Sequence, residues 1–158
     1  MSDSLEQYQT EWAHRDARRM AQPTGSPREI AAALLVIHSA YHTGRLSETW
    51  IGALVDKIIR CSGAGRDPLR ISEGAYGALQ EGRRPRTTLE HDPPISFYRD
   101  LIIEKRDLTA DQLIEALGLL RVTQILSDED LKLRDRGWKQ NRPKDAYQQC
   151  GITVRNDN

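Results

Sequence analysis

Two amphipathic stretches joined by a short turn constrain the fold of this chain more than any other feature. In residues 47–60, apolar side chains recur three and four positions apart, which is the spacing of one helix face. This stripe consists of Trp50, Ile51, Leu54, Val55, Ile58 and Ile59. Residues 27–42 carry a second apolar helical pattern, which follows the capping residue Ser26 and the first-turn proline Pro27. We therefore predict an antiparallel helical hairpin over about residues 27–60.

Shorter elements are expected after the hairpin. Helices are predicted at residues 72–79, 95–106 and 109–120. Ser127 is expected to cap a further helix, and Thr109 with Gln112 forms a capping-box pair. The stretch RVTQIL (121–126) is rich in β-branched residues and predicts a short strand, and residues 152–154 predict another. The expected fold class is mostly α, with α+β as the alternative, and with two or three short strands in the second half.

The chain is expected to form a single compact domain over residues 1–158. Leu5, Tyr8 and Trp12 fall near one face of a helical pattern, so residues 1–22 predict an N-terminal helical arm. Residues 61–71 contain two glycines and a proline and predict a flexible loop. This loop is the only candidate for an internal boundary.

Charge and cysteine content restrict the partners and the compartment. The 23 Lys and Arg residues balance the 23 Asp and Glu residues, so attraction to nucleic acid must come from local clusters of charge. Cys61 and Cys150 are distant in sequence, which favours two thiols in a reducing cytosol over a disulfide. The longest apolar run, residues 30–37, is far shorter than the roughly 20 residues that span a bilayer. We expect a cytoplasmic protein without a membrane partner.

The segment TTLEHDPP (87–94) holds the candidate catalytic residues, Glu90 and His91. An imidazole can accept a proton from water or a ribose hydroxyl near neutral pH, and Glu90 could orient it or bind a metal. Adjacent residues of a strand point to opposite faces, which argues against direct pairing of the two. The hypothesis therefore requires His91 to be accessible to solvent and surrounded by cationic side chains.

Two nuclease motifs resemble this segment in part. EHDPP resembles the opening half of the HNH (His-Me finger) motif, which implies His91 as general base. The following stretch ISFYRDLIIEKRDL lacks the Asn and His that complete that family's metal site. Arg86 and His91, in RTTLEH, resemble the Arg-x4-His signature of HEPN ribonucleases, although the flanking prolines depart from it. The order of these motifs along the chain also resembles uncharacterised bacterial and phage-borne proteins.

Basic residues cluster in two places that could hold phosphate. Arg83, Arg84 and Arg86 lie just before the Glu-His pair. The second cluster surrounds an aromatic side chain and comprises Arg134, Arg136, Trp138, Lys139, Arg142 and Lys144. Cations around an exposed aromatic ring suit phosphate contacts and base stacking. The alternative is a solvated helix end, with Trp138 closing the core.

Metal binding is not indicated by ligand spacing, and the cofactor is left unknown. His38 and His42 are four residues apart on one predicted helix and could chelate a metal. His38 falls in an apolar stripe, however, so core packing or an interhelical hydrogen bond is the favoured interpretation. A divalent ion near Glu90 stays an alternative.

Two classes of function fit these observations. The leading hypothesis is a protein directed to nucleic acid, as a phosphodiesterase that uses Glu90 and His91 beside the basic clusters. The alternative is a non-enzymatic helical interaction module or inhibitor of a phage or mobile-element type, which binds a host protein complex. Whether the chain is an enzyme is left open. A homodimer through the 27–60 hairpin is a further alternative.

Overall fold

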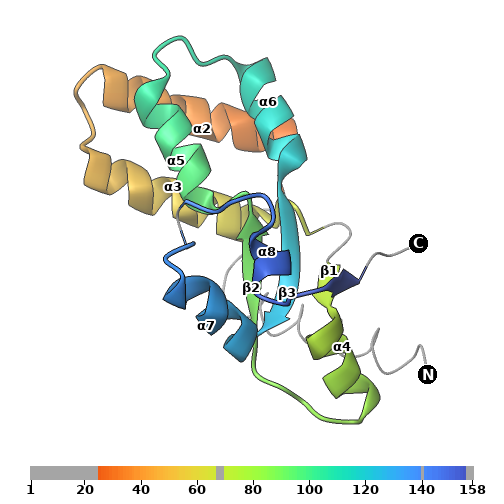
Figure 1. Cartoon of the computed structure of the whole chain (residues 1–158). Helices are drawn as coiled ribbons and strands as arrows, with labels where there is room; N and C mark the ends of the chain where they lie inside the picture. Colours follow the sequence, from red (N-terminus) through yellow and green to blue (C-terminus); the bar gives the residue numbers. More distant parts are fainter. Residues whose placement is uncertain (1–24, 67–69, 140, 156–158) are drawn as a thin grey trace.

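The computed structural model describes residues 25–66, 70–139 and 141–155, so the predicted N-terminal arm (1–22) lies outside the described residues. Figure 1 shows a group of helices packed together at one end of the molecule and a small sheet with shorter helices at the other. The prediction of a mostly helical fold with a few short strands is confirmed.

The helical layer contains the predicted hairpin. Its helices are α2 (Pro27–His42), α3 (Glu48–Ser62), α5 (Ile95–Glu104) and α6 (Ala110–Leu119). Buried side chains from all four helices form the largest apolar cluster, centred on residues such as Leu34, Ile51, Ile59, Ile102 and Leu113. Apart from Trp50, which is 62% exposed, the apolar stripes of α2 and α3 face this cluster, and the hairpin forms as the periodicity predicts.

Local signals fix several helix starts. Ser26 and Glu29 form a complete capping box at α2, and Thr109 and Gln112 form another at α6. The expected cap at Ser127 is wrong in detail, because α7 (Ser127–Asp135) already includes that residue. There the Glu129 carboxylate accepts a hydrogen bond from the Leu126 backbone N–H at 2.9 Å. An acidic side chain therefore replaces the expected hydroxyl at this helix start.

The sheet has four strands in the order β2-β3-β1-β4. They are β1 (Arg70–Ser72), β2 (Thr87–Asp92), β3 (Arg121–Leu126) and β4 (Val154–Arg155). β3 pairs antiparallel with β2 and parallel with β1, and β1 pairs antiparallel with β4. β3 is the predicted strand 121–126. The segment 61–71 was expected to be a loop, but it contains the last two residues of α3 and the first two residues of β1.

Different helices pack against the two faces of the sheet. On one face, Ile71 and Leu126 pack with α4 (Glu73–Gln80). On the other, Ile125 packs with α7, with α8 (Ala146–Gln149) and with the chain around Ile152. We call these the α4 face and the α7 face. Cys61 and Cys150 are both buried and form no disulfide.

Within the described ranges, no helix combines the length and the apolar character that a membrane crossing requires.

Candidate functional site

β2 separates the two predicted catalytic residues. Glu90 lies opposite Thr123 of β3, and His91 lies opposite Val122. Because neighbouring residues of a strand project to opposite sides, Glu90 belongs to the α7 face and His91 to the α4 face. The structure therefore does not bring the two side chains together in one pocket.

His91 is enclosed by the protein. The residue is only 5% exposed, and its Nε2 atom has no hydrogen-bond partner among the described residues. Burial, with smaller contributions from Arg60 and Arg66, lowers the pKa of His91 to about 3. The nearby cations thus come from the end of α3 and the loop after it, and not from the predicted cluster at Arg83–Arg86. The ring is neutral at physiological pH, but the structure does not give it the solvent access that catalysis requires.

Glu90 lies in a buried polar cluster on the α7 face. Its carboxylate accepts a hydrogen bond from the Arg142 guanidinium and forms an ion pair with it. The side chains of Arg142 and Glu90 are 4% and 14% exposed. Thr123 lies across the strand from Glu90, and the Tyr147 ring lies under the Arg142 guanidinium at 5.5 Å. Burial raises the pKa of Glu90 above its ordinary value, because desolvation outweighs the attraction of Arg142.

This ion pair corrects one prediction about nucleic-acid contacts. Arg142 belongs to the predicted binding cluster, but its guanidinium is turned inward and paired with Glu90. A phosphate could reach it only if the C-terminal segment detached from the sheet. Arg142 is therefore a structural residue in this conformation, and Glu90 is its counter-ion.

The first basic cluster lies on the surface beside α7. Arg83, Arg84 and Arg86 are all exposed, and Arg83 forms an ion pair with Glu81 at 2.5 Å. The backbone N–H of Ser127 donates a hydrogen bond to the Arg86 carbonyl oxygen at 3.0 Å. This bond holds the cluster next to the first residue of α7.

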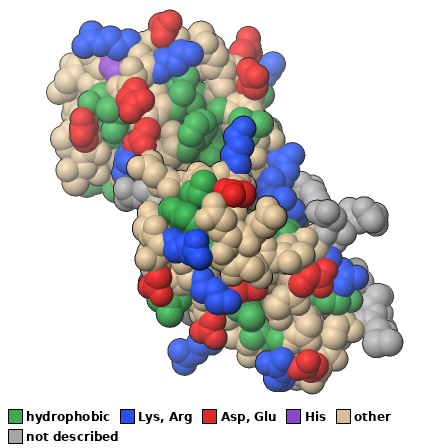
Figure 2. Space-filling view, viewed as in Figure 1, with side chains coloured by type: hydrophobic (Ala, Val, Ile, Leu, Met, Phe, Trp, Pro, Cys, Tyr) green, Lys and Arg blue, Asp and Glu red, His purple; other side chains and the backbone are tan. Residues whose placement is uncertain are grey.

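The second cluster lies at the other end of α7 and beyond it. Arg134, Arg136, Lys139 and Lys144 are exposed. Arg134 pairs with Asp130 one helical turn earlier, at 3.1 Å. Figure 2 shows Lys and Arg side chains interspersed with Asp and Glu on this part of the molecule. The predicted cations are thus on the surface, but acidic side chains lie among them.

Trp138 packs against an apolar core, as in the alternative interpretation of the second basic cluster. Its ring packs against the apolar cluster that contains Ile125 and Leu133. The Arg136 guanidinium lies over the ring, 5.1 Å from its centroid. The indole therefore contacts both the apolar cluster and a cation.

His38 and His42 hold helices together. The carbonyl oxygens of Lys105 and Ile102 lie 2.7 Å from His38 Nε2 and 2.9 Å from His42 Nε2, respectively, and accept these hydrogen bonds. These carbonyls belong to the C-terminal end of α5, where helical partners run out. In the described part of the chain, no three His, Cys, Asp or Glu side chains group as a metal site would require. The interhelical interpretation of both histidines is confirmed.

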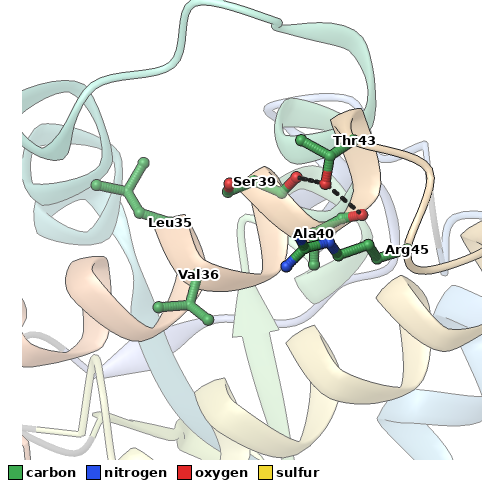
Figure 3. A pocket seen from close by; sticks show the side chains of 6 residues that line it. All are labelled: Leu35, Val36, Ser39, Ala40, Thr43 and Arg45. Carbon is green, nitrogen blue, oxygen red and sulfur yellow. Dashed lines mark hydrogen bonds between the residues drawn. The ribbon is translucent and has the colours of Figure 1, made fainter.

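One surface feature was not predicted from the sequence. A depression of about 470 Å³ lies on the outer side of α2 and is lined by Leu35, Val36, Ser39, Ala40, Thr43 and Arg45 (Figure 3). Val36 is 70% exposed although it stands in the apolar run 30–37. At 100° per residue, Val36 falls on the side of α2 opposite to the stripe of Leu34 and Ile37. That angular position was the signal that could have identified it.

Comparison of the chain with protein-family models finds no matching family, and comparison with curated proteins and with solved structures finds no significant match.

Proposed function

We propose that this protein binds nucleic acid through backbone phosphates and does not cleave it. The contacts would come from the basic surface, defined as the exposed residues Arg83, Arg84, Arg86, Arg134, Arg136, Lys139 and Lys144. The observation that carries the proposal is the contrast between these exposed cations and the enclosed imidazole of His91. A binding surface is available in this conformation, and a general base is not.

The physical basis of binding is release of counter-ions. Each cation that neutralises a phosphate displaces condensed salt from the nucleic acid, so affinity falls as salt rises. Because the whole chain has no net charge, binding depends on this local surface and not on a long-range field. Ion pairs such as Arg83–Glu81 and Arg134–Asp130 weaken the local field further. We therefore expect modest affinity that is strongly sensitive to salt.

Hydrolysis by His91 and Glu90 stays a prediction outside this proposal. It would require the cover of His91 to open and the two residues to act from opposite faces of the sheet. Incubation of the native protein with RNA and with single-stranded DNA, with and without divalent metal, tests it. Cleavage that is abolished by His91→Gln, with folding retained, would restore the phosphodiesterase hypothesis.

The test of binding is a fluorescence-anisotropy titration with short nucleic acids at several salt concentrations. The variant Arg86→Glu/Lys139→Glu reverses two charges of the basic surface, and Arg28→Glu/Arg45→Glu reverses two exposed charges of the helical layer. We expect the first variant to lose about two units of the slope of log K against log salt. The second should keep the native slope. Absence of binding at low salt, or equal losses in both variants, would overturn the proposal.

A second candidate function is association with a protein through the helical hairpin. Val36 is 70% exposed beside the depression on α2, and Trp50 is 62% exposed on α3. Exposed apolar side chains of this size are candidates for contact with another protein or with a second copy of the chain. Light scattering after gel filtration over a range of concentrations tests the homodimer. A dimer that Val36→Lys dissociates would support it, and a monomer at all concentrations would exclude self-association.

A further inference from the structure

We infer that the basic surface recognises the paired backbone of a double-stranded nucleic acid in preference to unpaired bases. The inference rests on the proposed function and names its ligand class. It comes from the aromatic side chains of the sheet part, which single-stranded ligands would need as stacking surfaces.

Every aromatic ring of the described sheet part has an arginine over it. Residues 70–92 and 121–155 contain three aromatic side chains, Tyr76, Trp138 and Tyr147. Arg155 lies 3.7 Å from the centroid of Tyr76, Arg136 lies 5.1 Å from that of Trp138, and Arg142 lies 5.5 Å from that of Tyr147.

The same rings also pack against apolar clusters. Trp138 and Tyr147 contact the cluster that includes Ile125, and Tyr76 contacts the cluster that includes Ile71. An unpaired base that stacked on one of these rings would have to displace a guanidinium or open a core. Since base stacking contributes about 1–3 kcal/mol per base, its loss removes this contribution from the affinity for single strands.

The arrangement of the cations suits a duplex groove. Arg83–Arg86 are held at the first residue of α7, and Arg134–Lys139 lie at and after its last turn. A nine-residue helix is about 14 Å long, close to the roughly 12 Å width of the major groove of B-form DNA. The two groups of cations could therefore contact phosphates on opposite sides of one groove.

The helical layer also carries exposed aromatic side chains. Trp50 is 62% exposed and Phe97 is 40% exposed, but they belong to α3 and α5 of the helical layer. If single strands bound more tightly than duplexes, stacking would have to occur on these two rings, which do not belong to the sheet part.

The first test compares a duplex with its separated strands in the same buffer, by anisotropy. Without stacking, we expect the duplex to bind about tenfold more tightly, which corresponds to about 1.4 kcal/mol. Equal or tighter binding of the single strand would overturn the inference and leave the proposed function intact. Binding to neither ligand would overturn both.

A pair of variants tests the role of the covered ring. Arg136→Gln removes a cation and uncovers the Trp138 ring, whereas Arg134→Gln removes a cation from the same region without uncovering a ring. Both should weaken duplex binding to a similar extent. Only Arg136→Gln should lower the ratio of duplex to single-strand affinity, by several fold. An unchanged ratio in Arg136→Gln, or an equal fall in both variants, would contradict the inference.

Discussion

The helical layer and the sheet part of this protein differ in how their buried and half-buried polar groups are hydrogen-bonded. In the helical layer, His38, His42 and Tyr98 hydrogen-bond to backbone carbonyl oxygens at 2.7–2.9 Å. In the sheet part, His91 Nε2 and Arg142 Nη1 are buried and have no hydrogen-bond partner among the described residues. Buried polar groups are usually paired, and those that are not call for a specific explanation.

The apolar cores of the two parts also differ in size. The main cluster of the helical layer contains fifteen buried residues, whereas the two clusters of the sheet part contain five and three. The helical layer therefore supplies most of the hydrophobic stabilisation. The sheet part is held by a small core and by buried charge, and it carries all the residues of the basic surface. This comparison indicates a stable scaffold attached to a more polar unit, and the proposed contacts with nucleic acid belong to that unit.

The largest predicted effect tests the scaffold. Leu34 is completely buried in the main cluster, so Leu34→Ala should lower the free energy of unfolding by about 4 kcal/mol, through lost burial and a cavity. Leu119→Ala, at a position on α6 that is 63% exposed, is the matched control and should change stability by less than about 0.5 kcal/mol. Urea unfolding measures both. A small effect at Leu34 would mean that the helical layer is not the main source of stability.

The next effect tests the buried charge of the sheet part. Glu90→Ala removes the counter-ion of a buried guanidinium, so we expect a loss of about 3 kcal/mol in unfolding free energy. The double variant Glu90→Ala/Arg142→Met removes both charges and should recover a large part of that loss. If the single variant is as stable as the native protein, Arg142 can reach solvent and is available to phosphate after all.

The enclosed imidazole predicts a dependence on pH. In the unfolded chain His91 takes up a proton near pH 6.5, but in the folded protein its pKa is about 3. Between these values acid favours the unfolded chain, so stability is present above pH 6.5 and falls as the pH decreases towards 3. From pH 7 to pH 5 this contribution should cost about 2 kcal/mol.

His91→Gln provides the comparison for that slope. The variant should lose less stability than the native protein over the same pH range, since the other titratable groups are unchanged. Chemical unfolding of both proteins at matched pH values measures the difference. Parallel loss of stability in the two proteins would indicate that His91 is open to protons, which would reopen the case for catalysis.

The smallest predicted effect concerns binding. Asp128 is exposed at the start of α7, between the two groups of cations of the basic surface. Asp128→Asn removes a negative charge that opposes phosphate, so affinity for nucleic acid should rise by about twofold at low salt. The gain should disappear at high salt because exposed charges are screened. Glu115→Gln, at an exposed acid of α6, is the control and should leave the affinity unchanged.

Local sequence patterns predict the helical layer better than the sheet. The stripes of residues 27–60, the cap at Ser26 and the capping box at Thr109 involve contacts three or four residues apart. They are confirmed except at Trp50, which is 62% exposed although it was predicted as part of the stripe. β1 is only three residues long and pairs in parallel with β3, some fifty residues later, so no local pattern predicts it. β2 is a polar segment whose pairing with β3 makes it a strand.

The candidate residues could be selected from the sequence, but most of their contacts could not. The sequence identified Glu90, His91 and the basic clusters as the unusual residues. It could not show that Glu90 pairs with Arg142, because 52 positions separate them. It also could not show that the cations near His91 are Arg60 and Arg66, at the end of α3 and in the loop after it. Both contacts depend on how the layers pack, and packing determines whether a polar residue is accessible.

Hydrogen exchange of the full chain, with and without a short duplex, tests the division between scaffold and contact surface most directly. The account predicts added protection in residues 83–86 and 127–144, at low salt, with little change in α2 and α3. Added protection confined to the α2–α3 hairpin, or none anywhere while the duplex is bound, would contradict it.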